Sequence, residues 1–204
     1  EVAIWIKTKF EQFGYSNTLL DSFLLQNSTG EFWQYNVVAN LTGHADPEYI
    51  TIIGGHHDCI TSAPFDSAPG ADDNASAVAA TLEIARIFKR YQIFPKYSIR
   101  FTTYAAEELG LHGSRFAAAK DAQNQVRIRH MINMDMIAHA RPQFENSVIF
   151  QAYDNSVELT NLAKQTCTQF TNLEYTVVND NSPSSDSRSY YAKGFQTIFL
   201  QEFD

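Results

Sequence analysis

The sequence predicts an α/β fold, with a central mixed, mostly parallel β-sheet and helices on both faces. Along most of the chain, short apolar segments typical of strands alternate with amphipathic segments typical of helices. Such alternation favours parallel strands, whereas two adjacent strand-like segments near the N-terminus predict an antiparallel hairpin. With 204 residues and no internal repeat or linker-like segment, the chain is predicted to form a single domain.

The first predicted elements are a helix and the hairpin. Apolar residues recur at helical spacing over residues 2–13, and Gly14 ends this pattern. Two strand-like segments, 22–26 and 32–41, flank the turn-forming residues 27–30. This part of the chain is therefore expected to form one edge of the sheet.

The rest of the chain alternates between strands and helices. The clearest helix covers residues 75–91, where Val78, Leu82, Ala85 and Phe88 line one face. A polar loop from Thr61 to Gly70 precedes it. The other predicted elements are strands at 49–53, 97–104, 128–134, 147–152, 173–178 and 195–203, and helices at 112–121 and 156–170.

The helix at 156–170 is amphipathic. Its spacing predicts that Leu159, Leu162 or Ala163, and Phe170 face the core. The segment from Asn179 to Ser187 is expected to be a loop before the last strand.

Composition excludes several classes of partner. The chain carries 15 basic and 23 acidic residues, a net charge of −8, and has no run of Lys or Arg, so no nucleic-acid partner is expected. No apolar stretch approaches the roughly 20 residues that span a bilayer, so no membrane insertion is expected. The two cysteines, Cys59 and Cys167, could form one disulfide, and the sequence leaves this pairing and the oligomeric state open.

Acidic residues and histidines follow several predicted strands at the point where each strand ends. The strand at 49–53 leads to His56 and Asp58, and the strand at 128–134 leads to Asp135. Two further groups of acids, Asp72-Asp73 and Glu107-Glu108, precede the long helix and follow the strand at 97–104. Because ligands bind at the carboxyl ends of strands in α/β sheets, these groups are expected to converge on one edge.

Converging carboxylates and one imidazole predict a divalent metal site. Taken singly, each residue has an ordinary explanation, such as a helix cap for Asp72-Asp73 or a solvated turn for Glu107-Glu108. Together they would repel one another without a cation, and a mixed nitrogen and oxygen donor set suits zinc. If the segment is extended, Glu107 and Glu108 point in opposite directions, so that one binds metal and the other transfers a proton. The spacing of His56 and Asp58 suits a carboxylate that orients a metal-bound imidazole.

Four motifs resemble those of the co-catalytic zinc aminopeptidases of the bacterial leucyl aminopeptidase type, a group related to the glutaminyl-peptide cyclotransferases. The motifs are Ile-Ile-Gly-Gly-His56-His-Asp58, Ala-Pro-Gly-Ala-Asp72-Asp73-Asn-Ala-Ser, Tyr-Ala-Ala-Glu107-Glu108-Leu-Gly-Leu-His-Gly-Ser and Ile-Asn-Met-Asp135-Met. They occur in the family's order, and the similarity extends from about Asn36 to Glu202. The resemblance implies the α/β fold already predicted from the alternation of elements.

The resemblance also implies a site with two zinc ions. His56 and Asp135 would bind one ion, Glu108 the other, and Asp73 would bridge them. A cis peptide bond is implied between Asp73 and Asn74.

The implied reaction is removal of the N-terminal residue of a peptide with a free N-terminus. In this reaction Glu107 is the general base toward a metal-activated water, and Asp58 orients His56. The first residue of the substrate is expected to be apolar. The family's habit of export favours a secreted or periplasmic location.

Two features depart from the family pattern. The segment matched to the family's Ser-Asp-His reads Ser185-Asp186-Ser187, so Ser187 is predicted to replace a fifth metal ligand and to weaken the site of Glu108, with Asp186 as a substitute ligand. The chain also ends at Asp204, where the family usually continues, and is therefore expected to lack the usual C-terminal segment. These departures keep open a second class, a catalytically impaired peptidase-like binding domain. A glutaminyl-peptide cyclotransferase is the third alternative.

Overall fold

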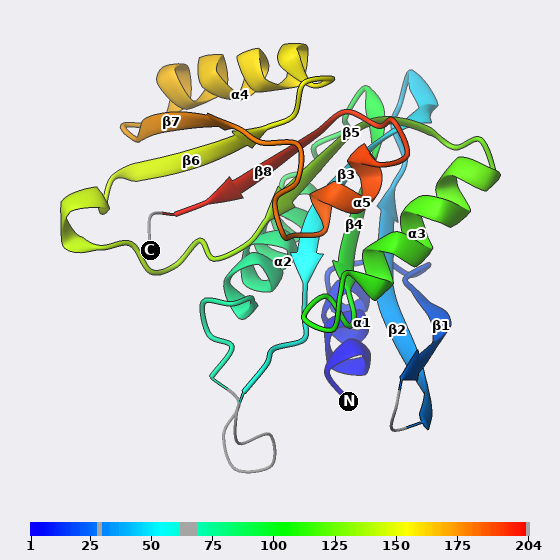
Figure 1. Ribbon diagram of the computed structural model, residues 1–204. Helices are drawn as coiled ribbons and strands as arrows, with labels where there is room; N and C mark the ends of the chain where they lie inside the picture. The colour runs from blue at the N-terminus through cyan, green and yellow to red at the C-terminus, as the bar shows by residue number, and fades with distance from the viewer. Residues whose placement is uncertain (28–29, 62–68, 203–204) are drawn as a thin grey trace.

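The chain forms one eight-stranded mixed sheet in the computed structural model, which describes residues 1–27, 30–61 and 69–202 (Figure 1). The strands are β1 (Leu19–Asn27), β2 (Gly30–Leu41), β3 (Asp46–His56), β4 (Tyr97–Tyr104), β5 (Arg127–Met134), β6 (Ser147–Ala152), β7 (Glu174–Asn179) and β8 (Thr197–Gln201). Their order in the sheet is β1-β2-β4-β3-β5-β8-β6-β7. Strands β4, β3, β5 and β8 pair in parallel, as do β6 and β7, whereas the pairs β1–β2, β2–β4 and β6–β8 are antiparallel. The predicted mixed, mostly parallel sheet is confirmed.

Helices cover both faces of the sheet, as predicted (Figure 1). Helices α1 (Val2–Gln12) and α2 (Ala75–Arg90) pack with β2 and β4 in one core cluster around Phe10, Leu82 and Phe101. Helices α3 (His112–Gln123) and α5 (Ser187–Tyr191) pack on the other face, with Ala118 and Tyr190 against the central strands. Helix α4 (Val157–Phe170) covers the end of the sheet that β6 and β7 form.

The spacing of apolar residues predicted the buried side of α2 better than the buried sides of α1 and α4. In α1, Ile6 and Phe10 are buried but Trp5 is 54% exposed. In α4, Leu159 is buried as predicted, whereas Leu162 and Phe170 are 52% and 72% exposed. Ala163, the alternative to Leu162 in the prediction, does pack against the core, and the inward face continues through Cys167 and not through Phe170.

Two short helices differ from the sequence prediction, and parts of two predicted loops lie outside the described residues. The segment expected to be a loop up to Ser187 is followed by α5, a helix of only five residues, and β8 begins at Thr197. A short 3₁₀ helix, Pro142–Phe144, was also not predicted. Ser28, Thr29 and residues 62–68, which belong to the predicted turn and polar loop, lie outside the described residues.

Neither cysteine is paired in the structure, and Cys59 is exposed whereas Cys167 is buried. Among the helices of the described residues, none has the length and apolarity needed to cross a bilayer.

Two glycines allow β3 to pass close to its neighbours just before His56. A Cβ on Gly54 would lie 1.7 Å from the carbonyl oxygen of Thr102, and one on Gly55 would lie 2.2 Å from that of Met134. Any larger residue would push the strand away, because both contacts are with backbone. The Gly54-Gly55 pair therefore brings His56 close to the ends of the adjacent strands.

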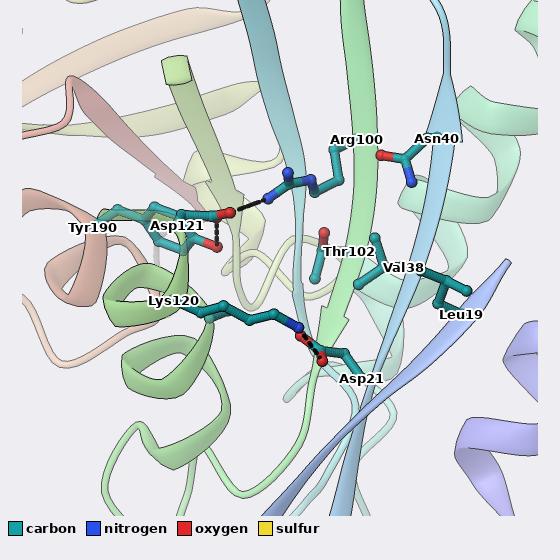
Figure 2. A pocket seen from close by; sticks show the side chains of 10 residues that line it. Leu19, Asp21, Val38, Asn40, Arg100, Thr102, Lys120, Asp121 and Tyr190 are labelled. Atoms are coloured by element: carbon teal, nitrogen blue, oxygen red, sulfur yellow. Dashed lines mark hydrogen bonds and ion pairs between the residues drawn. The ribbon is translucent and has the colours of Figure 1, made fainter. Parts of the chain in front are cut away.

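A partly buried ion pair joins α3 to the sheet on the face opposite α1 and α2. One guanidinium nitrogen of Arg100 contacts both carboxylate oxygens of Asp121, at 2.8 and 2.7 Å (Figure 2). The side chains of Arg100 and Asp121 are only 17% and 9% exposed, and the hydroxyl of Tyr190 donates to the same carboxylate at 3.5 Å. The side chain of Asp121 thus lies inward on α3.

Replacing Asp121 is expected to destabilise the fold. The substitution Asp121→Asn keeps the shape but leaves the Arg100 charge without its counter-ion in a poorly hydrated place, which typically costs about 3–5 kcal/mol. Urea unfolding followed by circular dichroism measures this difference. Asp46→Asn is the matched control, since its pair with Lys96 is exposed and its loss should leave the unfolding free energy close to the unsubstituted value. Equal effects of the two substitutions would contradict the role of the Arg100 pair.

Candidate metal centre

Three predicted ligands meet at the carboxyl ends of the central strands. His56, Asp73 and Asp135 each offer one donor atom, and these atoms all lie within 4.8 Å of one another. The Nε2 atom of His56 lies 3.1 Å from Oδ1 of Asp73 and 3.3 Å from Oδ1 of Asp135. Asp73 and Asp135 are 62 positions apart in the sequence, and the order of the strands in the sheet brings them together.

Asp58 holds the imidazole of His56 at Nδ1, the nitrogen that is turned away from Asp73 and Asp135. The Nδ1 atom of His56 lies 3.0 Å from the main-chain carbonyl oxygen of Asp58, whereas the nearer carboxylate oxygen is 3.7 Å away. The carboxylate instead accepts hydrogen bonds from the main-chain N–H groups of Glu107 and Glu108, at 3.0 and 3.2 Å. Asp58 thus contacts His56 as expected, but mainly through its backbone, and its side chain anchors the glutamate segment.

Asp73 is positioned at the start of α2. The peptide bond between Asp73 and Asn74 is cis, which confirms the expectation from the motif. The side-chain oxygen of Asn74 accepts a hydrogen bond from the N–H of Ala77 at 3.2 Å and so caps the helix. Its amide nitrogen donates to the carbonyl oxygen of Met134 at 3.1 Å. Asn74 therefore joins the helix that carries Asp73 to the strand that precedes Asp135.

Asp135 is held by a chain of buried hydrogen bonds. The hydroxyl of Ser185 donates to Oδ2 of Asp135 at 2.7 Å, and the side-chain amide of Asn133 donates to that hydroxyl at 2.6 Å. Both Ser185 and Asn133 are fully buried. Since Oδ2 is occupied in this way, Oδ1 is turned toward His56 and Asp73.

Glu107 and Glu108 lie beside this group on a bend and a turn and not on an extended segment. Ala106 has a φ of +56°, and both glutamates line the same pocket. The expectation that neighbours point to opposite sides is therefore wrong here. An Oε2 atom of Glu107 lies 4.0 Å from Nε2 of His56, and Glu107 is 8% exposed. Burial first, and then the charge of Asp186, raise the pKa of Glu107 to about 8.

The donor set fits a cation. An imidazole nitrogen carries at most one proton, yet two carboxylate oxygens converge on Nε2 of His56. Burial lowers the pKa of His56, but hydrogen bonds to Asp135 and Asp73 outweigh this effect and raise it to about 12, so the group strongly favours a positive charge at this point. Ligand atoms around a tetrahedral zinc with bonds near 2.0 Å are about 3.3 Å apart, close to the observed separations.

A pocket of about 470 Å³ opens over the three ligands. One end contains His56 and the acidic residues Asp73, Glu107, Glu108 and Asp135. The rest of the wall is formed by Gly110, Leu111, Met136, Gln151, Asp180, Ser182, Pro183, Ser184, Phe199 and Gln201. A small molecule entering this pocket would therefore meet the candidate metal centre directly.

Ser187 does not take the place of a ligand in this structure. Its hydroxyl lies 2.8 Å from that of Tyr153, the residue is fully buried, and it is absent from the described pocket wall. Asp186 is also fully buried and does not line the pocket. The residue of this segment that contacts the cluster is Ser185, whose role the sequence motif did not indicate.

The sequence profile of Peptidase family M28 matches residues 36–204. The chain belongs to this family. It is 44% identical over 110 residues to a probable zinc metalloprotease of Pyrenophora teres f. teres, an alignment that covers 52% of this chain and 23% of that protein. It is 30% identical over 190 residues to the probable aminopeptidase YDR415C of Saccharomyces cerevisiae, covering 89% of this chain and 50% of the relative. The chain thus spans half or less of the length of these relatives.

Solved structures support the fold assignment. The Legionella pneumophila LapA aminopeptidase superposes with a TM-score of 0.79 at 23% identity, covering 98% of this chain and 53% of that one. A glutaminyl cyclase from an Acidobacteriales bacterium superposes with a TM-score of 0.73 at 21% identity, covering 96% of this chain and 68% of that one. The zinc aminopeptidase fold expected from the motifs is confirmed, and the glutaminyl cyclase shares this fold.

The hydrogen bond from Ser185 to Asp135 predicts an effect on metal affinity. In Ser185→Ala the carboxylate of Asp135 loses its partner and can rotate, and such outer contacts typically contribute 10- to 100-fold in metal affinity. Titration with zinc against a chromophoric chelator measures the change. Ser189→Ala is the control, because it removes another buried hydroxyl, paired with Ser114, from the same part of the chain without touching the cluster. Unchanged zinc affinity in Ser185→Ala would contradict the positioning role.

Proposed function

We propose that this chain is the catalytic part of a zinc-dependent aminopeptidase that removes the N-terminal residue of peptides. The observation that carries the proposal is the convergence of His56, Asp73 and Asp135 on one point at the base of an acidic pocket. Membership of a peptidase family and the names of the relatives, which include a probable zinc metalloprotease and a probable aminopeptidase, support it.

His56, Asp73 and Asp135 would hold a zinc ion. When bound, the ion supplies a Lewis acid that polarises the scissile carbonyl and lowers the pKa of water. Asp73 and Glu108 line the same pocket, which supports Glu108 as the ligand of a second ion. Because Glu108 is not part of the three-residue group, the second position is proposed to bind its ion more weakly.

Glu107 is proposed as the general base. It is buried at the inner end of the pocket, and its raised pKa suits a carboxylate that accepts a proton from the attacking water and returns it to the leaving amine. The hydrogen bond from its main-chain N–H to Asp58 fixes its place beside His56. Asp58 is thus a positioning residue for both His56 and Glu107.

The charge of the pocket supports removal of single N-terminal residues. The described lining residues include Asp73, Glu107, Glu108, Asp135 and Asp180 but neither lysine nor arginine. The free α-ammonium group of a peptide is attracted to such a site, whereas an internal peptide bond offers no charge there.

The sequence left two alternative functions open, an impaired binding domain and a glutaminyl-peptide cyclotransferase. The impaired binding domain rests on the missing fifth ligand, and Ser187, whose hydroxyl contacts Tyr153, does not supply one; zinc content and hydrolysis separate this alternative from an active enzyme. A glutaminyl-peptide cyclotransferase shares the fold, but at 21% identity this likeness concerns the fold alone. Incubation with peptides that begin with glutamine separates the reactions, because cyclisation retains all residues whereas an aminopeptidase releases one.

The central test replaces Glu107. Glu107→Gln keeps the size of the side chain but removes the base, and general bases typically contribute 10²- to 10⁴-fold, so we expect kcat to fall by about that factor. Zinc content should stay unchanged, since Glu107 is not a proposed ligand. The measurements are hydrolysis of aminoacyl-4-nitroanilides and zinc per chain by atomic emission.

The control for this test is Glu145→Gln, which changes an exposed glutamate remote from the pocket wall. Undiminished hydrolysis by Glu107→Gln would refute the assigned role. A chelator should abolish hydrolysis by the unsubstituted chain, and zinc should restore it; hydrolysis that persists without metal would contradict the zinc-dependent function.

A further inference from the structure

The far end of the pocket differs in character from the metal centre. Gln151 and Gln201 come from β6 and β8, and Asp180 follows β7. Their side of the sheet also carries Phe199, because Gln151 and Phe199 are paired across the two antiparallel strands. The alternate residues Phe150 and Ile198 pack with α4 on the opposite face. The pocket floor is thus the open face of β8 and β6, apolar at Phe199 and polar toward its rim.

Asp180 is held in place at this rim. Its main-chain N–H donates to the carbonyl oxygen of Ala152 at 3.1 Å. Its Oδ1 atom accepts hydrogen bonds from the N–H and the hydroxyl of Ser182, at 2.8 and 3.1 Å. Both contacts use Oδ1, and the described residues form no hydrogen bond to Oδ2. A fixed carboxylate that lines the pocket and keeps one oxygen without a hydrogen bond from the described residues is suited to bind a cation.

The distance across the floor selects a long side chain. Strand β8 lies beside β5, which leads to Asp135, and β6 lies beside β8. With strands about 4.8 Å apart, β6 is roughly 10 Å across the sheet from the strand of Asp135, and β7, which leads to Asp180, is one strand spacing further. A short side chain that starts at the metal centre ends over Phe199, whereas a long one extends toward Gln151 and Asp180.

We propose that this pocket selects peptides whose N-terminal residue is lysine or arginine, with Asp180 as the residue that recognises the side-chain cation. This inference rests on the proposed aminopeptidase function. Met136 and Phe199 contact the aliphatic stem, the amides of Gln151 and Gln201 accept hydrogen bonds from the head group, and Asp180 supplies the charge. The proposed first residue is thus amphipathic, whereas the sequence predicted an apolar one.

The test compares two substrates of equal length. Lysyl- and norleucyl-4-nitroanilide share a straight four-carbon stem and differ in the terminal charge. The zinc-loaded chain is expected to cleave the lysyl substrate with a kcat/KM about tenfold higher. In Asp180→Asn, which can still accept the hydrogen bonds of Ser182, this ratio should fall close to one. The preference should also weaken with increasing salt.

Glu174→Gln is the matched control. It removes an exposed carboxylate from the other end of the same strand, β7, and should keep the unsubstituted ratio. Equal hydrolysis of the two substrates by the unsubstituted chain, or a ratio that Asp180→Asn leaves unchanged, would overturn the inference while the aminopeptidase function stands. Hydrolysis of neither substrate would overturn both.

Discussion

The structure depends on the convergence of two carboxylates on one imidazole nitrogen. Oδ1 of Asp73 and Oδ1 of Asp135 both lie within 3.3 Å of Nε2 of His56, a place where a single proton satisfies only one of them. Three further acidic residues, Asp58, Glu107 and Glu108, lie nearby, and the whole group is partly or fully buried. A divalent cation resolves this repulsion, and the pocket above it gives the cation access to a substrate.

Most of the contacts that hold these side chains in place involve main-chain groups of the scaffold. The carboxylate of Asp58 accepts from two main-chain N–H groups, Asn74 caps α2 and reaches the carbonyl of Met134, and the glycines before His56 permit close strand packing. Apart from the helix cap, each contact joins two different elements. A rigid sheet edge thus positions groups that repel one another, which is the arrangement expected where binding of an ion stabilises the site.

The fold and the ligand triad were within reach of the sequence, because strand patterns and strand ends are local features. The exposure of Phe170 could not be predicted from the sequence, since burial in α4 depends on where β6 and β8 lie. The contact that Ser187 makes was also not predictable, because a motif gives order along the chain but not the direction of a side chain, and this one turns toward Tyr153. For the same reason the buried partnership of Asp121 with Arg100, 21 residues away, and that of Ser185 with Asp135 could only come from the structure.

Anomalous diffraction at the zinc edge, from crystals of the chain grown with zinc, tests the central claim most directly. The account predicts a strong peak within bonding distance of His56, Asp73 and Asp135, and a second, weaker peak next to Glu108. A chain that takes up no zinc at this point, or that binds it only at surface histidines, would contradict the assignment of the metal centre and the proposed reaction together.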